Sequence, residues 1–181
     1  MKKARDSFCS FCGTGFRDLQ GYPRRCAACG VETWANPIPV SVVLLPIQHR
    51  DRTGLLVIRR GIEPRRGLLA LVGGFVEEHE SWQSAGAREM REEAGVKIAA
   101  DSLETFWFTS SHPYPNRILL FSLGAAVASN DLPPFAPCGE ASERGAVFGS
   151  AGLDDLFAFP LHVQAASRYF AGRGTADYTP L

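Results

Sequence analysis

One stretch of the chain, Gly74 to Val96, constrains the fold and the chemistry more than any other. Its second half predicts a helix, because Ser81 is a favourable N-cap residue and Gly95 is a favourable residue just past the C-terminus. The helix also carries an apolar stripe, formed by Ala87, Met90 and Ala94. We therefore expect a helix that packs against the rest of its domain through this stripe.

Three glutamates, Glu89, Glu92 and Glu93, stand at positions i, i+3 and i+4 of this helix. Their carboxylates are expected to project from one face, opposite the apolar stripe. Like charges this close repel by roughly a few tenths of a kcal/mol per pair, and a hard divalent cation with oxygen ligands reverses that sign. Magnesium is the natural candidate, with manganese as the alternative. An isolated run of this kind is more often a solvated helix face, so the interpretation depends on the surrounding residues.

The surrounding residues complete a longer pattern. Gly74 is followed after five residues by Glu80, and after seven more by the run from Arg88 to Val96. This matches at every position the signature of the Nudix hydrolases, G-x5-E-x7-R-E-U-x-E-E-x-G-U, where U is a bulky aliphatic residue. With residue frequencies of several per cent each, a chance match is on the order of one in a million. The chain therefore resembles that family.

The resemblance implies a fold and a reaction. The Nudix fold is an α/β/α sandwich with a mixed sheet, and Nudix enzymes hydrolyse nucleoside diphosphates linked to another group. By analogy, Glu89, Glu92 and Glu93 are the catalytic residues and hold the divalent metal ions. Glu93 is the first candidate for the general base. The backbone carbonyl of Gly73 resembles an additional metal ligand of the family.

The resemblance also assigns supporting residues. A structural role is expected for Gly74, Glu80 and Arg88. In the family, the pair that Glu80 and Arg88 match ties the preceding loop to the helix. A further acidic metal ligand in the family comes from the loop before the last strand. Here that loop offers Glu140 and Glu143, and spacing alone does not decide between them.

Four of the five cysteines form two Cys-x2-Cys pairs: Cys9, Cys12, Cys26 and Cys29. Two such pairs separated by thirteen residues are typical of a tetrahedral four-thiolate zinc site, since each pair offers two sulfurs to one ion. With four protein ligands, such a zinc ion is structural. Two disulfides are the alternative, and they require an oxidising compartment that the N-terminal sequence does not support. Cys138 has no partner in this pattern and reads as an ordinary thiol.

Six basic residues accompany these cysteines, namely Lys2, Lys3, Arg5, Arg17, Arg24 and Arg25. They either balance the negative charge of a four-thiolate zinc site or form a patch for phosphates or RNA, and the first is favoured. The whole chain has 181 residues and a formal charge of zero, which fits a small module and one medium domain. We expect a zinc ribbon over residues 1–36 and a catalytic domain over residues 37–175.

The same sequence predicts the location of the protein and the elements of its larger domain. No apolar signal-peptide core follows the start, and no run is long enough to span a bilayer, so we expect a cytoplasmic protein without membrane contact. Strands and helices are expected around the central helix. The expected strands cover residues 40–47, 54–59, 96–99, 103–110, 117–127 and 145–148, with a turn at 51–54, a loop at 130–144 and helices at 153–157 and 161–171.

The pairing of a four-cysteine ribbon with this signature narrows the resemblance to the NADH pyrophosphatases and to related zinc-ribbon FAD and ADP-ribose pyrophosphatases. In NADH pyrophosphatases the phenylalanine that Phe75 matches stacks on a base, and Trp34 lies where they carry a second stacking aromatic. Their hallmark S-Q-P-W-P-F-P is replaced here by Ser-Ser-His-Pro-Tyr-Pro-Asn. The resulting candidates for substrate binding are Ser111, His112 and Tyr114, and a plain strand connector is the alternative.

The function expected from this resemblance is Mg²⁺-dependent hydrolysis of the pyrophosphate bond of a dinucleotide such as NADH or NAD⁺. Hydrolysis of FAD or ADP-ribose, and removal of an NAD cap from RNA, are alternatives within the same enzyme class. A non-catalytic nucleotide sensor that binds nucleic acid is the alternative from a different class. It is disfavoured because such regulators often lose catalytic carboxylates, and this chain retains all three. Related enzymes are often homodimers, so a homodimer is expected.

Overall fold

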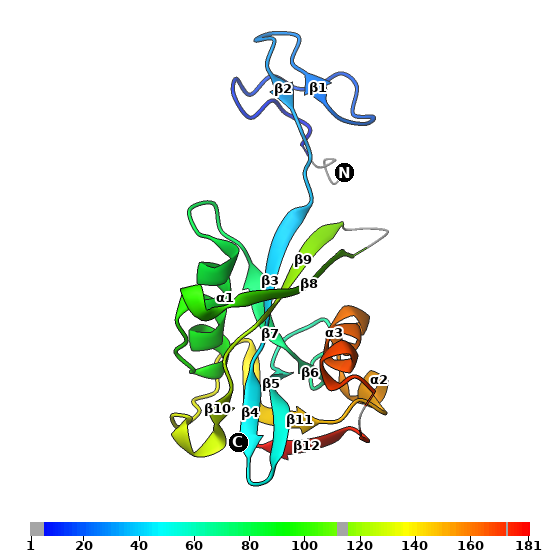
Figure 1. Ribbon diagram of the computed structural model, residues 1–181. Coiled ribbons are helices and arrows are strands. Elements are labelled where there is room, and N and C mark those ends of the chain that lie inside the picture. Colours follow the sequence, from blue (N-terminus) through cyan, green and yellow to red (C-terminus); the bar gives the residue numbers. More distant parts are fainter. Residues whose placement is uncertain (1–5, 112–115, 173) are drawn as a thin grey trace. The chain divides into compact units, whose positions relative to one another are not determined.

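The computed structural model describes residues 6–111, 116–172 and 174–181 (Figure 1). Two candidate substrate-binding residues, His112 and Tyr114, lie outside the described residues. The chain divides into two compact units, Met1–Pro37 and Ile38–Leu181. In the part of the chain that is described, no helix is both long enough and apolar enough to cross a bilayer.

The smaller unit is built on two cysteine loops and a minimal hairpin. Strands β1 (Arg24–Arg25) and β2 (Glu32–Thr33) pair antiparallel. After each cysteine pair a glycine turns the chain back, because Gly13 and Gly30 adopt the left-handed backbone region and donate to the carbonyls of Cys9 and Cys26 at 2.9 Å. With so short a hairpin, little apolar core is available to hold this unit together.

The larger unit contains two sheets of mixed direction. One has the order β7-β3-β9-β8, with β3 parallel to β9 and the other neighbours antiparallel. The second has the order β10-β4-β5-β11-β12, with β6 also paired to β5 and with β10 parallel to β4. The strands are β3 (Ile38–Leu44), β4 (Pro46–His49), β5 (Arg52–Arg60), β6 (Leu69–Ala70), β7 (Val72–Phe75), β8 (Glu104–Ser110), β9 (Arg117–Leu123), β10 (Val127–Ala128), β11 (Ala141–Phe148) and β12 (Asp177–Pro180).

Three helices cover the strands of this unit from opposite sides (Figure 1). Successive residues of a strand point to opposite faces, so the apolar runs in β3 and β5 feed two separate cores. Val42 and Leu55 pack with α3, whereas Val43 and Leu56 pack with α1. The result is the α/β/α sandwich with a mixed sheet that the sequence predicted. The helices are α1 (Trp82–Ala94), α2 (Leu153–Leu156) and α3 (Pro160–Phe170), with 3-10 turns η1 (Ala100–Ser102) and η2 (Ser129–Asp131).

Two predicted strands were wrong in the same way, because each is split where the chain passes between sheets. The strand expected at residues 40–47 is interrupted at Leu45, so that β3 lies in one sheet and β4 in the other. The strand expected at residues 117–127 likewise ends at Leu123 and resumes as β10. The two crossings are adjacent, since the Gly124 amide donates to the Leu44 carbonyl at 3.0 Å.

Other boundaries also differ from the prediction. The turn between β4 and β5 consists of Arg50 and Asp51, one residue ahead of the expected turn, because His49 pairs with Arg52. Residues 96–99 form no strand: Val96 is buried, but no neighbouring strand pairs with it. Strand β11 starts inside the loop predicted for residues 130–144, and β12 was not predicted because its short polar sequence carries no strand pattern.

Candidate active site

Helix α1 begins and ends at the predicted residues. The Ser81 side chain accepts a hydrogen bond from the Ser84 amide at 3.1 Å, which satisfies one of the free amides of the first turn. At the other end Gly95 adopts φ 71°, and its amide donates to the Arg91 carbonyl at 3.2 Å. These two ends fix the register of the three glutamates with respect to the sheet below.

Glycines bring α1 unusually close to the sheet. A Cβ added at Gly86 would lie 2.9 Å from Val43 Cγ2 and 3.0 Å from Ser41 Oγ, so a side chain there would push the helix off β3. A Cβ added at Gly74 would collide with the carboxylate of Glu89. The absent side chain of Gly74, the first residue of the signature, therefore leaves the space that the Glu89 carboxylate occupies.

The glutamates do not all project opposite the apolar stripe, so that part of the sequence prediction was wrong. Glu93 is only 6% exposed and lies on the buried side of α1, next to Met90 and Ala94. Its Oε2 atom accepts a hydrogen bond from the Gly73 amide at 3.2 Å. Glu93 thus turns toward the backbone of β7, whereas the space next to Gly74 is taken by the carboxylate of Glu89. Glu92, by contrast, has a side chain that is 48% exposed.

Burial changes the acidity of these groups. Removal from water raises the pKa of Glu93 to about 8, and the nearby negative charges of Glu89 and Glu140 act in the same direction. Burial also raises the pKa of Glu89, against the opposing effect of Arg88. The site therefore concentrates carboxylates where water is scarce, which is the arrangement that attracts a cation.

Arg88 organises the edge of this site. It donates to Glu80 at 2.7 Å and to the Phe75 carbonyl at 3.0 Å, which ties the loop before α1 to the helix. The same guanidinium reaches Glu89 at 2.7 Å and Glu92 at 3.2 Å. Its bond to Glu80 lowers the pKa of that carboxyl group. Two of the three candidate ligands are thus held by an arginine of their own helix.

The structure separates the two acidic residues that spacing could not distinguish. Glu143 lies in β11 and pairs with Arg59 at 2.6 Å, which lowers its pKa. Glu140 precedes β11, and its charge acts on both Glu89 and Glu93. Of the two, Glu140 is therefore the one whose charge acts on the other glutamates, whereas Glu143 is paired with Arg59.

The expected substrate-binding residues lie in different places. Phe75 is 51% exposed, and the Arg117 guanidinium stacks over its ring at 4.6 Å. Ser111 closes the end of the β8-β9 pair, where its Oγ accepts from the Arg117 amide at 3.1 Å. Trp34 is 61% exposed and belongs to the smaller unit. Sequence reasoning missed Arg117, because nothing in its neighbourhood marks it as a partner of Phe75.

A second residue that the sequence did not single out is Arg144. It is buried and donates to the Ala94 carbonyl at the end of α1 and to the Pro133 carbonyl, both at 2.8 Å. A cation at this end of a helix is also favoured by the helix dipole. Arg144 thus links α1 to the segment that leads to Glu140. The sequence gives one signal of this role, because Arg144 is a charged residue in β11 and the residues that follow it in that strand are apolar.

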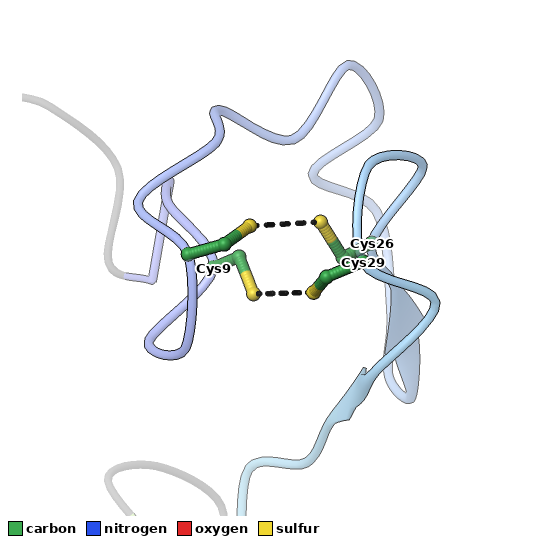
Figure 2. A group of neighbouring side chains, drawn as sticks. Cys9, Cys26 and Cys29 are labelled. Carbon is green, nitrogen blue, oxygen red and sulfur yellow. Dashed lines mark hydrogen bonds between the residues drawn. The ribbon is translucent and has the colours of Figure 1, made fainter.

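The four cysteines of the smaller unit converge (Figure 2). Their sulfur atoms lie within 4.8 Å of one another, with Cys9 facing Cys29 at 3.7 Å and Cys12 facing Cys26 at 3.6 Å. All four are free thiols. The donor set fits a tetrahedral zinc ion. Among the described residues this is the one group of three or more His, Cys, Asp or Glu side chains gathered so closely.

The family of the chain follows from a comparison with known domains. A model described as the NUDIX domain matches residues 37–148, more than half of the chain. The chain belongs to the Nudix family. Among curated proteins, this Nudix chain is 31% identical over 128 residues to NAD-capped RNA hydrolase NudC of Deinococcus radiodurans. It is 30% identical over 135 residues to NAD-capped RNA hydrolase NUDT12 of Macaca fascicularis.

These alignments cover 70% of the present chain but only 44% and 28% of the two relatives, so the chain spans less than half of their length. Solved structures give the same fold. A Nudix hydrolase from Nitrosomonas europaea has a TM-score of 0.68 at 23% identity, over 92% of each chain. The NUDIX domain of Shewanella oneidensis NrtR, complexed with ADP ribose, has a TM-score of 0.60 at 18% identity over 75% of this chain and 88% of that one.

Proposed function

We propose that this Nudix protein is a pyrophosphohydrolase that uses Mg²⁺ or Mn²⁺ to split a dinucleotide of the NADH or NAD⁺ type into two mononucleotides. The observation that carries the proposal is the buried carboxylate of Glu93, hydrogen-bonded to the Gly73 amide and surrounded by the charges of Glu89 and Glu140. A purely structural helix gains nothing from burying negative charges together.

The residues of this cluster fit a hard divalent cation. The candidate donors are oxygen atoms, which Mg²⁺ and Mn²⁺ prefer. In the described part of the chain no cationic side chain lies within 4.0 Å of the Glu93 carboxylate, so a bound metal ion would be its nearest positive charge. The proposed ligands are Glu89, Glu92, Glu93 and Glu140 with the Gly73 carbonyl. When bound, such a cation neutralises the diphosphate and acidifies the attacking water.

The protein side chains have separate tasks in this proposal. Glu93 accepts the proton of the attacking water, and a cation bound beside it would keep its carboxyl group ionised, as a general base requires. Arg88 positions Glu89 and Glu92 while it holds the loop at Glu80. Phe75 offers a flat face to a nucleobase, on the side of its ring that Arg117 leaves free.

The choice of a dinucleotide rests on resemblance. The Gly-Phe-Val-Glu opening of the signature resembles that of NADH pyrophosphatases, and two similar proteins carry the name NAD-capped RNA hydrolase. NAD-capped RNA, FAD and ADP-ribose are the alternative substrates. The proposal also includes a structural zinc ion on the four cysteines, a homodimer, and action in the cytoplasm, a compartment whose reducing conditions keep such thiols free.

A turnover screen tests the proposal directly. The purified chain is incubated with NADH, NAD⁺, FAD, ADP-ribose and an RNA bearing a 5′ NAD cap, each with Mg²⁺, Mn²⁺ or EDTA. We expect mononucleotide release from NADH or NAD⁺ only with a divalent cation. Release from none of the five substrates would rule the proposal out, and release from FAD alone would reassign the substrate. Light scattering of the same sample gives the oligomeric state.

A further inference from the structure

The loop between β5 and β6 is basic. Residues 59–67 read Arg-Arg-Gly-Ile-Glu-Pro-Arg-Arg-Gly, with four arginines against a single acidic residue, Glu63. The proposed reaction does not use any of them. A positive loop on its own is often only a solvated surface, so its position and its internal contacts decide whether it has a binding role.

The loop contacts the segment that carries Glu140. The Gly61 amide donates to the Glu140 carbonyl at 2.7 Å, and a Cβ added at Gly61 would lie 3.0 Å from the Gly139 carbonyl oxygen. Glu140 is one of the proposed metal ligands, so the loop contacts a residue of the proposed site through its backbone.

The first two arginines hold the loop in shape. Arg59 donates to the Gly67 carbonyl at 2.9 Å and also pairs with Glu143. Arg60 donates through its side chain to the Pro64 carbonyl at 2.9 Å, and its backbone carbonyl accepts from the Gly67 amide at 2.9 Å. The conformation of the loop is therefore set by its own backbone and by Arg59 and Arg60, without the side chains of Arg65 and Arg66.

Arg65 and Arg66 are the exposed members of the loop. Within the described residues, neither guanidinium has a carboxylate partner within 4.0 Å. Arg65 stands at φ 67°, a left-handed conformation that costs a residue other than glycine about 1 kcal/mol. A charged side chain is thus presented at a position where glycine would be easier to accommodate. Free guanidinium groups on a fixed loop are suited to bidentate binding of phosphate.

Resting on the proposed function, we infer that Arg65 and Arg66 bind a phosphate that the substrate carries outside its scissile diphosphate. In a dinucleotide of the NADH type such a phosphate is an ester on the adenosine ribose. It is a monoester in NADPH and a phosphodiester in an RNA that bears a 5′ NAD cap. The two arginines add affinity for these substrates and leave the hydrolysis step itself unchanged.

The test compares kcat/KM for NADH, NADPH and a short NAD-capped RNA in the wild type and in Arg65→Ala/Arg66→Ala. The double variant is expected to lose about tenfold on NADPH, on the capped RNA or on both, through KM, and to stay within about twofold on NADH. A loss on NADPH assigns the monoester, and a loss on capped RNA assigns the phosphodiester. Equal changes on all three substrates, or no change on any, would overturn the inference.

Two further variants control for folding and for charge. Arg50→Ala removes an exposed arginine that also has a left-handed backbone, φ 56°, but stands in the turn at the other end of β5, so all three substrates should be unaffected. Arg65→Lys/Arg66→Lys keeps both charges and should retain part of the preference for substrates that carry the additional phosphate. If Arg50→Ala lowered kcat/KM for NADPH or capped RNA, relative to NADH, as much as the double variant does, a local role for the loop would be contradicted.

Failure of the inference can be told apart from failure of the proposed function. If the wild type hydrolyses none of the three substrates, the proposed reaction is wrong, and the loop is then judged by binding alone. Calorimetry with AMP, adenosine 2′,5′-bisphosphate and adenosine 3′,5′-bisphosphate should show tighter binding of a bisphosphate by the wild type, and no such preference in the double alanine variant. Identical affinities in the two proteins would dismiss the loop as a phosphate site.

Discussion

At the scale of single residues, Glu93 is the centre of the site. The sequence predicted three carboxylates on one face, opposite the apolar stripe, whereas the fold buries Glu93 and leaves Glu92 half exposed. Spacing along a helix gives the relative directions of side chains but not the face that the sheet covers. Here the covered face includes Glu93, which accepts from the Gly73 amide, and the absent side chain of Gly74 leaves space for Glu89.

Replacement of Glu93 by glutamine should separate catalysis from folding. Glu93→Gln is expected to lower kcat by about 10²–10⁴-fold, the usual contribution of general acid-base catalysis. Stability should be kept, because the amide oxygen of glutamine can still accept from Gly73 and no charge is buried. Steady-state kinetics and thermal unfolding measure the two effects. Glu78→Gln, an exposed neighbour on the loop before the helix, is the control and should behave as the wild type.

His162 predicts how stability depends on pH. Burial, together with the charge of Arg60, lowers its pKa to about 3, and its Nδ1 atom accepts from the Leu71 amide at 3.1 Å. An unfolded histidine titrates near 6.5, so between about pH 6.5 and 3 the unfolded chain binds a proton that the folded chain does not. The contribution of neutral His162 to the free energy of unfolding is therefore fully present above pH 6.5 and is lost as the pH falls toward 3.

The measurement is urea unfolding of the wild type and of His162→Gln at pH 5, 6 and 7. The variant should be less stable at pH 7, by about 1–3 kcal/mol if the bond to Leu71 is lost, and should lose less stability on acidification. Parallel pH profiles for the two proteins would show that His162 does not carry this dependence.

At the scale of elements, the close approach of α1 to β3 is what places the carboxylates. Gly86→Ala should destabilise the protein by about 1–3 kcal/mol, although alanine favours an isolated helix, because the new methyl group meets Val43, Ser41 and Leu103 at 2.9–3.1 Å. Activity should fall as well, since the helix moves away from Gly73. Urea unfolding and kcat are the readouts.

The matched control is Gly139→Ala, where an added Cβ meets nothing within 4 Å. It should change neither stability nor turnover measurably. If Gly86→Ala were as stable as this control, the packing of α1 on β3 would not be what fixes the glutamates.

Element prediction from the sequence succeeded where local signals are strong and failed where pairing is set over long range. Helix α1 was predicted with both ends, because Ser81 and Gly95 act within one turn. The crossings at Leu45 and Gly124 were not predicted, since an apolar run looks the same whether or not it changes sheet. Among the site residues, the location of the glutamates on α1 could be predicted, whereas the burial of Glu93 and the contacts of Arg117 and Arg144 depend on residues distant in the sequence.

At the scale of the whole molecule, the chain consists of two units with different sources of stability. Ile38–Leu181 has two apolar cores, whereas the described part of Met1–Pro37 contributes to neither core and instead gathers four cysteines. A metal that binds only the folded unit contributes its binding energy to folding. Removal of zinc should therefore affect the two units unequally.

Cys26→Ser should abolish stoichiometric zinc, measured by elemental analysis, and should remove the protection of the smaller unit against proteolysis. The main thermal transition should shift by less than about 2 °C, because the larger unit folds around its own cores. Ser10→Ala, a change between two cysteines that retains all four thiols, is the control. Loss of the main transition in Cys26→Ser would mean that the two units do not fold independently.

The central claim is that the glutamates of α1 bind divalent cations against a dinucleotide diphosphate. A crystal of the protein with Mn²⁺ and a non-hydrolysable NADH analogue tests this most directly, through the anomalous signal of manganese. We predict manganese peaks at about 2.2 Å from carboxylate oxygens of Glu93 and Glu89, with the diphosphate bridging them. Manganese peaks only elsewhere, with Glu89 still paired to Arg88 and Glu93 without an ion, would contradict the account.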